Sequence, residues 1–178
     1  MRQLNIVYLA FFLFFTQCHE GVSASELSIN SLTATSVKAQ NKMLARRVYE
    51  EGLSQGIFRV PYTFDFIGHG GGTNTFTHED GIKEAKGWRV AFPDLKVEVD
   101  LILAEDDLVS VRWTARGVNS QAGMGIPATG KQVQTSGTTV FRFVNGAIAE
   151  EWTAGDALGL LRQLGLMPEG INKQQSGE

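Results

Sequence analysis

The sequence predicts an α+β fold in a single domain. Its first half carries stretches with apolar residues at helical spacing, whereas its second half carries segments in which apolar and polar residues alternate. An Asn-Gly pair at 145–146 separates two of those segments and is a strong signal for a tight antiparallel hairpin. Helices followed by antiparallel strands are typical of α+β domains. A twisted sheet of this kind can curl around the early helices and leave a small-molecule cavity at its open end.

The first half of the chain is predicted to hold two helices with a strand between them. Apolar residues recur at helical spacing from Val37 onward, and Gly56 supplies the glycine that often stops a helix. Thr77 and Asp80 resemble a capping box, with Asp in place of the usual Glu. The expected elements are a flexible lead-in over 25–36, a helix over 37–54, a strand over 62–69 and a helix over about 78–92.

The second half is predicted to be mostly sheet. Apolar side chains at every second position indicate half-buried strands, and the Asp-Asp pair at 106–107 marks the first turn between them. A short apolar helix follows the last strand, and the polar tail over 169–178 is expected to be flexible. The expected strands cover 95–103, 109–116, 132–144 and 147–153, and the final helix carries Ala157, Leu160, Leu161 and Leu164 on one face.

Residues 1–24 are predicted to be a signal peptide rather than part of the fold. A positive charge at the second position precedes an apolar run over 6–15 that is too short to span a bilayer as a helix. Small residues then lead to a cleavage site before Ser25, which predicts a secreted or periplasmic protein. The alternative is a lipoprotein anchored through Cys18, although the small residues expected before such a cysteine are absent.

Composition excludes several classes of partner and chemistry. The net charge is −3, and residues 1–24 hold one Arg and one Glu, so cleavage leaves it unchanged. A mildly acidic chain disfavours nucleic acid, and a membrane after signal removal, as partners. The only cysteine lies in the signal segment, so the mature chain is expected to form no disulfide. His69 and His78 share no ligand spacing, and we therefore expect no metal site.

Asp156 is the first candidate for chemistry. It lies between the end of the last strand and the final helix, which places it at the rim of whatever those elements enclose. A carboxylate beside apolar surface resists ionisation, so its pKa rises toward what proton abstraction from carbon requires. The other interpretation is an N-cap, because Asp is preferred immediately before a helix. The pattern leaves both interpretations open.

Other candidates lie on the predicted strands. His69 ends a strand before three glycines and could donate a hydrogen bond to a developing enolate oxygen, or be a structural histidine. Glu150 shares the alternation phase of Ile148 and Trp152 and could face inward as a second carboxylate, although the pattern favours a solvated edge position. Three tryptophans could wall a pocket for an aromatic ligand and otherwise belong to the core: Trp88, Trp113 and Trp152.

One strand also suggests a contact with a second copy of the chain. Arg112, Thr114 and Arg116 occupy the face opposite to Trp113. That face is either solvated or part of a subunit interface in which the sheet pairs with itself.

The order and spacing of several short segments are more specific than any one of them. The segments are Tyr49-Glu50-Glu51, Asp65-Phe66-Ile67-Gly68-His69, Ala91-Phe92-Pro93-Asp94-Leu95, Arg112-Trp113-Thr114-Ala115-Arg116-Gly117, Gly125-Ile126-Pro127-Ala128-Thr129-Gly130-Lys131, and the stretch from Trp152 to Gly165. Over Asn41 to Leu166 the chain resembles the SnoaL-like polyketide cyclase, or ester cyclase, family of the nuclear transport factor 2-like superfamily.

The resemblance implies a cone-shaped α+β fold that encloses a pocket. It also implies ring closure by intramolecular aldol condensation without cofactor or metal, with the base at Asp156 and an auxiliary histidine at His69. Members of the family are commonly homodimers or larger. The domain is therefore expected over 37–168.

The sequence thus predicts an exported small-molecule enzyme that performs cofactor-independent general-base chemistry on a polyketide-like or other carbonyl compound. The alternative is a secreted, non-catalytic module that binds a small apolar ligand in the same cavity. A third reading is another chemistry of the superfamily, such as isomerisation or dehydration.

Overall fold

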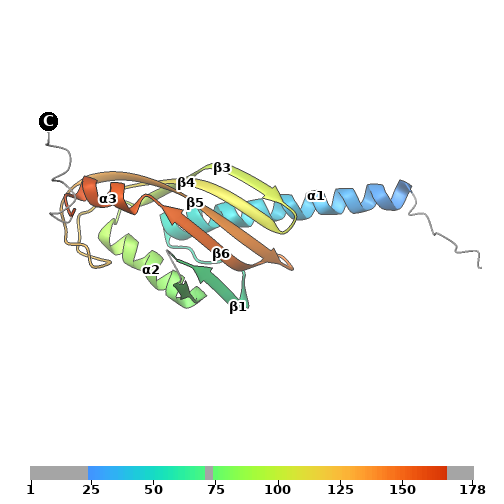
Figure 1. The fold of residues 1–178 in the computed structure, drawn as a ribbon, viewed down its shortest axis with the longest axis horizontal. Helices are drawn as coiled ribbons and strands as arrows, with labels where there is room; N and C mark the ends of the chain where they lie inside the picture. Colours follow the sequence, from blue (N-terminus) through green and yellow to red (C-terminus); the bar gives the residue numbers. More distant parts are fainter. Residues whose placement is uncertain (1–23, 71–73, 168–178) are drawn as a thin grey trace, which may run out of the picture.

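The structure is a computed structural model that describes residues 24–70 and 74–167 (Figure 1). The predicted tail over 169–178 and nearly all of the predicted signal peptide lie outside the described residues. Within the described ranges no helix is both long and apolar enough to cross a membrane. In chain order the elements are α1 (Ala24–Arg47), the π-helix η1 (Val48–Leu53), β1 (Tyr62–His69), β2 (Thr75–Phe76), α2 (His78–Ala91), β3 (Lys96–Glu105), β4 (Leu108–Val118), β5 (Gln132–Val144), β6 (Ala147–Gly155) and α3 (Ala157–Leu164).

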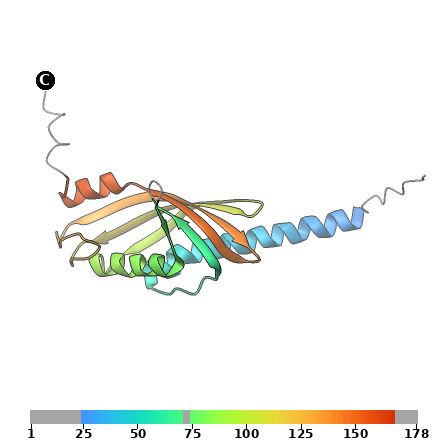
Figure 2. The ribbon, with the colours of Figure 1, turned by 60° about the horizontal axis from the view of Figure 1, so that its bottom comes forward.

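The strands form one curled, unclosed sheet in the order β2-β1-β6-β5-β4-β3. All neighbouring strands are antiparallel except β1 and β6, which run parallel. The end of α1, η1 and α2 lie against the concave side of this sheet (Figure 2), which we call the inner face. This arrangement confirms the predicted α+β fold, because the early helices fill the space that the strongly twisted sheet encloses.

The local turn and cap signals are confirmed. Asn145 and Gly146 both adopt positive φ, at 50° and 78°, as a two-residue hairpin turn of the right twist requires. Thr77 and Asp80 form the predicted capping box at the start of α2. Gly56 ends the first helical segment with φ of 75°, a conformation that glycine adopts without strain.

The first helix is longer than the sequence pattern predicts. The structure places residues 25–36, which we expect to be a flexible lead-in, inside α1, and the helix projects well beyond the sheet (Figure 1). Residues 31–37 are exposed, so nothing requires an apolar stripe there, and helical periodicity gives no signal where a helix packs against nothing. The periodic part begins where Leu44, Ala45 and Tyr49 enter the core.

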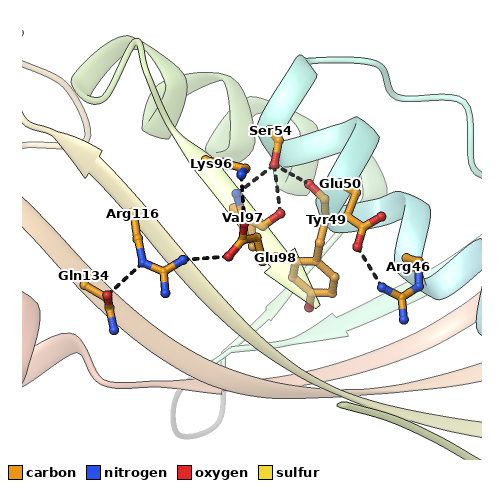
Figure 3. Close-up of polar contacts among 9 residues, drawn as sticks. All are labelled: Arg46, Tyr49, Glu50, Ser54, Lys96, Val97, Glu98, Arg116 and Gln134. Atoms are coloured by element: carbon orange, nitrogen blue, oxygen red, sulfur yellow. Dashed lines mark hydrogen bonds and ion pairs between the residues drawn. The ribbon is translucent and has the colours of Figure 1, made fainter. Parts of the chain in front are cut away.

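The hydroxyl of Ser54 attaches the end of the helix to β3. Ser54 accepts a hydrogen bond of 2.7 Å from the backbone N–H of Val97 on β3, and its oxygen lies 3.1 Å from the carbonyl oxygens of both Val97 and Tyr49 (Figure 3). The attachment holds η1 against β3. It thereby fixes the direction in which the Tyr49 ring enters the inner face.

Two apolar clusters flank a polar stretch of the inner face. Phe141 near one end of β5 belongs to the main cluster, together with Tyr49. Val133 near the other end belongs to a smaller cluster that also contains Leu164 of α3. Between Val133 and Phe141 the inner face of β5 carries Thr135, Gly137 and Thr139, and this is where polar groups gather.

Candidate functional site

Strand register brings a polar group of side chains together on the inner face. Val111 of β4 pairs with Thr139, and Thr139 pairs with Thr153 of β6. Because paired residues share a face, these positions and the buried Val111 all point toward the helices. We call the group the inner-face cluster; its members are Tyr49, Trp113, Thr139, Glu151 and Thr153.

A β-bulge decides which of two neighbouring glutamates belongs to this cluster. Arg142 pairs with Glu150, but the next residue, Phe143, pairs with Ile148, which leaves Ala149 as an extra residue in β6. The extra residue reverses the alternation at that point. Ile148 therefore faces inward while Glu150 faces outward, so the inward option considered for Glu150 is not realised. Glu151, the residue after it, faces inward instead.

Hydrogen bonds converge on the hydroxyl of Thr139. The phenol of Tyr49 donates to it over 2.5 Å, and the indole N–H of Trp113 donates to it over 3.2 Å. The hydroxyl of Thr153, on the neighbouring strand β6, lies 2.7 Å from it on the same face. Thr139 is completely buried, whereas Thr153 as a whole residue is exposed.

Two glycines make room for the indole of Trp113. Gly137 and Gly155 are paired across β5 and β6, and Trp113 is the register partner of Gly137 on β4. A Cβ atom at Gly137 would lie 2.3 Å from the ring, and one at Gly155 would lie 3.4 Å from it. The Tyr49 ring stacks on the same indole with centroids 5.8 Å apart. Trp113 is thus packed on the inner face, as the sequence predicts for a pocket or core residue.

Glu151 is the carboxyl group of the inner face with a perturbed pKa. The structure gives it no hydrogen bond or ion pair with any other described residue, and no cation offsets its charge there. Burial raises its pKa from the ordinary 4.5 to about 7, and the charge of Glu84 on α2 adds to the effect. Glu151 in turn helps burial to raise the pKa of Tyr62. Such a group can both accept and return a proton near neutral pH.

Two further candidate side chains, Trp88 and His78, belong to helix α2, which lies against the inner face. The indole N–H of Trp88 donates to the Glu84 carboxylate over 3.2 Å, and Trp88 packs with the smaller apolar cluster. His78 is half-buried and stacks on Tyr62 with ring centroids 3.9 Å apart. Burial lowers the pKa of His78, which favours the neutral imidazole at neutral pH.

Asp156 lies at the rim and caps α3. Its side chain accepts a hydrogen bond of 2.8 Å from the backbone N–H of Gly159, which is the N-cap geometry that the sequence allows. The residue is exposed. Its backbone N–H donates to Ser136 of β5, so the end of β6 and the start of α3 are held beside the glycine pair.

The remaining sequence candidates lie on the outer face of the sheet. His69 pairs with Trp152 in the β1–β6 register and stacks on it in parallel, with centroids 4.9 Å apart. Its Nε2 atom lies 3.5 Å from Glu150, and Arg142 forms an ion pair with the same carboxylate. We call these four residues the outer-face cluster. The structure therefore does not bring His69, Glu150 or Trp152 together with the inner-face cluster. His69 is also separated from Asp156, because its register partner Trp152 precedes Asp156 by four residues.

A shallow groove of about 510 Å³ lies elsewhere, between η1 and β3 (Figure 3). Its charged groups are already paired. Glu50 forms an ion pair with Arg46, and Glu98 forms ion pairs with both Lys96 and Arg116. We assign this groove no chemistry. No cluster of side chains suited to hold a metal ion occurs in the parts of the chain that the structure describes.

The family model described as SnoaL-like polyketide cyclase matches residues 44–164. The chain belongs to this family.

Solved structures agree with that assignment. AclR from Streptomyces galilaeus, a proposed hydroxylase, is 30% identical, with a TM-score of 0.63 over 76% of this chain and 99% of its own. IdmH from Streptomyces antibioticus, a proposed polyketide cyclase, is 28% identical, with a TM-score of 0.62 over 71% of this chain and 99% of its own. A proposed SnoaL-like polyketide cyclase from Jannaschia sp. CCS1 is 23% identical, with a TM-score of 0.66 over 74% and 96%, and shows the shared fold. No curated protein sequence matches the chain significantly.

The sequence patterns did not single out three members of the inner-face cluster, Glu151, Thr139 and Thr153. Alternation places Glu151 and Glu150 on opposite faces. It does not say which of them shares the inner face with Ile148, because that depends on the bulge at Ala149. The paired glycines at 137 and 155 are the one available signal, since glycine inside a strand marks a close approach by another group.

The pKa of Glu151 predicts how stability depends on pH. In the unfolded chain the group ionises near pH 4.5, whereas in the folded chain it keeps its proton to about pH 7. Its contribution is therefore fully present below pH 4.5 and is lost as the pH rises from 4.5 to 7. We expect Glu151→Gln to be more stable than the wild type at pH 8, by up to roughly 3 kcal/mol, and similar to it at pH 4. Urea denaturation across this range measures the difference.

The neighbouring glutamate supplies a matched control. Its hydrogen bond and ion pair with Arg142 lower the pKa of Glu150. Glu150→Gln should therefore be less stable than the wild type at pH 8, which is the opposite sign. A loss of stability at pH 8 in both variants would contradict the inward, unpaired placement of Glu151.

Proposed function

We propose that this SnoaL-like protein performs cofactor-independent acid–base chemistry on an enolisable carbonyl compound of the polyketide type. The observation that carries the proposal is the carboxyl group of Glu151, which lies on the inner face without a cation and has a pKa of about 7. A carboxyl group with a pKa near the working pH is an efficient proton acceptor and donor. The family membership and the cyclase-named neighbours support the reaction class.

The first step would be removal of a proton from carbon. The Glu151 carboxylate takes the proton from a carbon between two carbonyl groups, and the electrons of the C–H bond form the C=C bond of an enolate. The carbonyl π electrons move onto oxygen. Such a proton is moderately acidic, so a single well-placed carboxylate suffices, and general-base catalysis contributes about 10²–10⁴-fold.

The second step would close a ring. The enolate carbon attacks a second carbonyl carbon of the same molecule, and the resulting alkoxide takes the proton back from Glu151. One C–C bond forms, one C=O bond becomes C–OH, and no net oxidation or reduction occurs. Holding the substrate folded would supply much of the remaining acceleration, because the two reacting carbons then meet without loss of translational freedom.

Asp156 is the rival for the role of base. The family resemblance assigns the base to this position, and its place at the rim is compatible with contact to a substrate. Its side chain, however, is exposed and already accepts the N–H of Gly159. The geometry therefore favours Glu151 as the base and Asp156 as the helix cap. Asn also caps helices well, so Asp156→Asn removes the charge while keeping the cap.

The two carboxylates can be separated by one assay. A β-diketone in D₂O serves as the probe, and NMR follows exchange of its α-protons. We expect Glu151→Gln to slow the protein-catalysed exchange by about 10²-fold or more. Asp156→Asn should stay within about threefold of the wild type, and Glu150→Gln on the outer face serves as the control for a neighbouring charge change.

The opposite result would reassign the base. Loss of exchange in Asp156→Asn with normal exchange in Glu151→Gln would favour the position implied by the resemblance. Wild-type protein that binds diketones, as seen by thermal shift, but exchanges no α-protons would favour the alternative of a non-catalytic binding module.

We also propose that the protein is exported. The support is the N-terminal pattern of a positive charge, an apolar run and small residues before Ser25. Expression of the full chain in a bacterial host should yield a mature protein that begins at Ser25 in the periplasm or medium. N-terminal sequencing checks this, and an intact Met1 in the purified protein would contradict it.

We further propose self-association through the outer face of the sheet. Leu101 and Leu103 on β3 are 52% and 60% exposed, beside the outward-facing Arg112 that the sequence assigns to a possible interface. Leu103→Glu should shift the oligomer toward monomer in light scattering coupled to size exclusion. The matched control is Val90→Glu on α2, which is 50% exposed on a different face. A monomeric wild type would contradict the proposal.

A further inference from the structure

The loop between β4 and β5, residues 119–131, folds back onto the last turns of helix α2. The side chain of Asn119 is completely buried, and its Nδ2 atom donates to the backbone carbonyl of Ala91 over 3.3 Å. Ile126 packs against the smaller apolar cluster, which contains Ala91. A Cβ atom added at Gly123 would lie 3.0 Å from the backbone nitrogen of Ala91, so loop and helix approach each other closely there. The loop is therefore docked on α2.

The tip of this loop is a tight turn that presents a methionine to the helix. Gly123 and Ile126 exchange two backbone hydrogen bonds, of 3.0 and 2.8 Å. The two residues between them, Met124 and Gly125, both have positive φ, at 53° and 72°, as a type I′ turn requires. The turn sets the direction in which the Met124 side chain leaves the loop.

The thioether of Met124 lies over Gly87 of α2. A Cβ atom at Gly87 would come within 2.4 Å of the sulfur and 3.2 Å of Cγ, so the thioether occupies the place that a side chain at Gly87 would fill. Met124 is nevertheless 41% exposed. The residue thus holds the tip of the loop against the helix while it remains within reach of small dissolved molecules.

We propose that Met124 is a site of reversible oxidation by peroxide, and that its oxidation releases the 119–131 loop from α2. The sulfur lone pair attacks one oxygen of hydrogen peroxide, and the S–O bond forms as the O–O bond breaks. The departing hydroxide takes the proton from the oxygen that stays on sulfur. The products are methionine sulfoxide and water, with sulfur oxidised by two electrons and peroxide reduced by two. Methionine sulfoxide reductases reverse the change.

The docked position does not suit a sulfoxide. Gly87 lies inside α2, four residues before the helix ends at Ala91, so the N–H groups around it are used within the helix. An acceptor that leaves water without gaining a donor is unfavourable. The sulfoxide oxygen is therefore expected to turn toward water and carry the end of the side chain away from Gly87. Because Ile126 follows Met124 by two residues, the opened turn would also uncover the smaller apolar cluster.

Peroxide treatment, followed by mass spectrometry and amide hydrogen exchange, tests the proposal. We expect oxidation of Met124 to raise the exchange rate of the 119–131 amides by about tenfold, and treatment with methionine sulfoxide reductases to restore the original rate. Met43 is the matched control, because it is 54% exposed on α1 and belongs to neither apolar cluster. Oxidation of Met43 in the Met124→Leu variant should leave the exchange of the loop unchanged.

Two substitutions at Met124 separate the polarity of the sulfoxide from other effects of the oxidant. Both replacements are unbranched at Cβ, which suits the positive φ at this position. Met124→Leu keeps an apolar side chain and should stay docked before and after peroxide treatment. Met124→Gln places a polar group at a similar distance from the backbone, and it should raise the exchange of the loop by about tenfold without any oxidant.

Three results would overturn the proposal. The first is a wild type in which Met124 resists peroxide while Met43 is oxidised. The second is a fully oxidised Met124 with loop exchange equal to that of the reduced protein. The third is an equal rise in loop exchange in Met124→Leu after treatment, because the thioether at 124 would then not be the group that responds.

Discussion

One extra residue in β6 determines the chemistry of the inner face. Ala149 interrupts the alternation between the buried Ile148 and the two glutamates. Each side chain of β6 after Ala149 therefore points to the face opposite the one it would occupy in a regular strand. Without the bulge, Glu150 would face the helices and Glu151 would face outward. The inner carboxyl group would then lose its place beside Thr153, and the outer-face cluster would lose the partner of Arg142.

The bulge gives two adjacent carboxylates opposite environments. Glu150 is paired with a guanidinium on the outer face, where ionisation is favoured. Glu151 lies among aromatic rings and hydroxyl groups, where ionisation is resisted. A single strand thus carries a carboxylate that is ionised at neutral pH on one side and a carboxyl group with a pKa of about 7 on the other. This separation by environment is how proteins give the same side chain different chemical tasks.

Local signals in the sequence predicted most helices, strands and turns, but they did not predict which side chains meet in the inner-face cluster. The hairpin at Asn145-Gly146 and the capping box at Thr77 depend on a few neighbouring residues, so the sequence contains all the information they require. The inner-face cluster depends on which strands are neighbours and on where a bulge falls, which alternation alone does not contain. Alternation gave the correct face for Trp113 because its strand pairs regularly with β5. His69 and Trp152 lie side by side because β1 pairs with β6 in parallel. The sequence indicated only antiparallel neighbours, so this contact was not predicted.

The glycine pair beneath Trp113 links positions that are far apart in the chain. The indole occupies the volume that side chains at 137 and 155 would fill, so any larger residue at Gly137 displaces the ring and, with it, a donor to Thr139. A smaller residue at 113 would leave the volume beside Gly137 and Gly155 unfilled. Replacements at 113 and at 137 are therefore expected to be coupled in their effect on stability rather than additive.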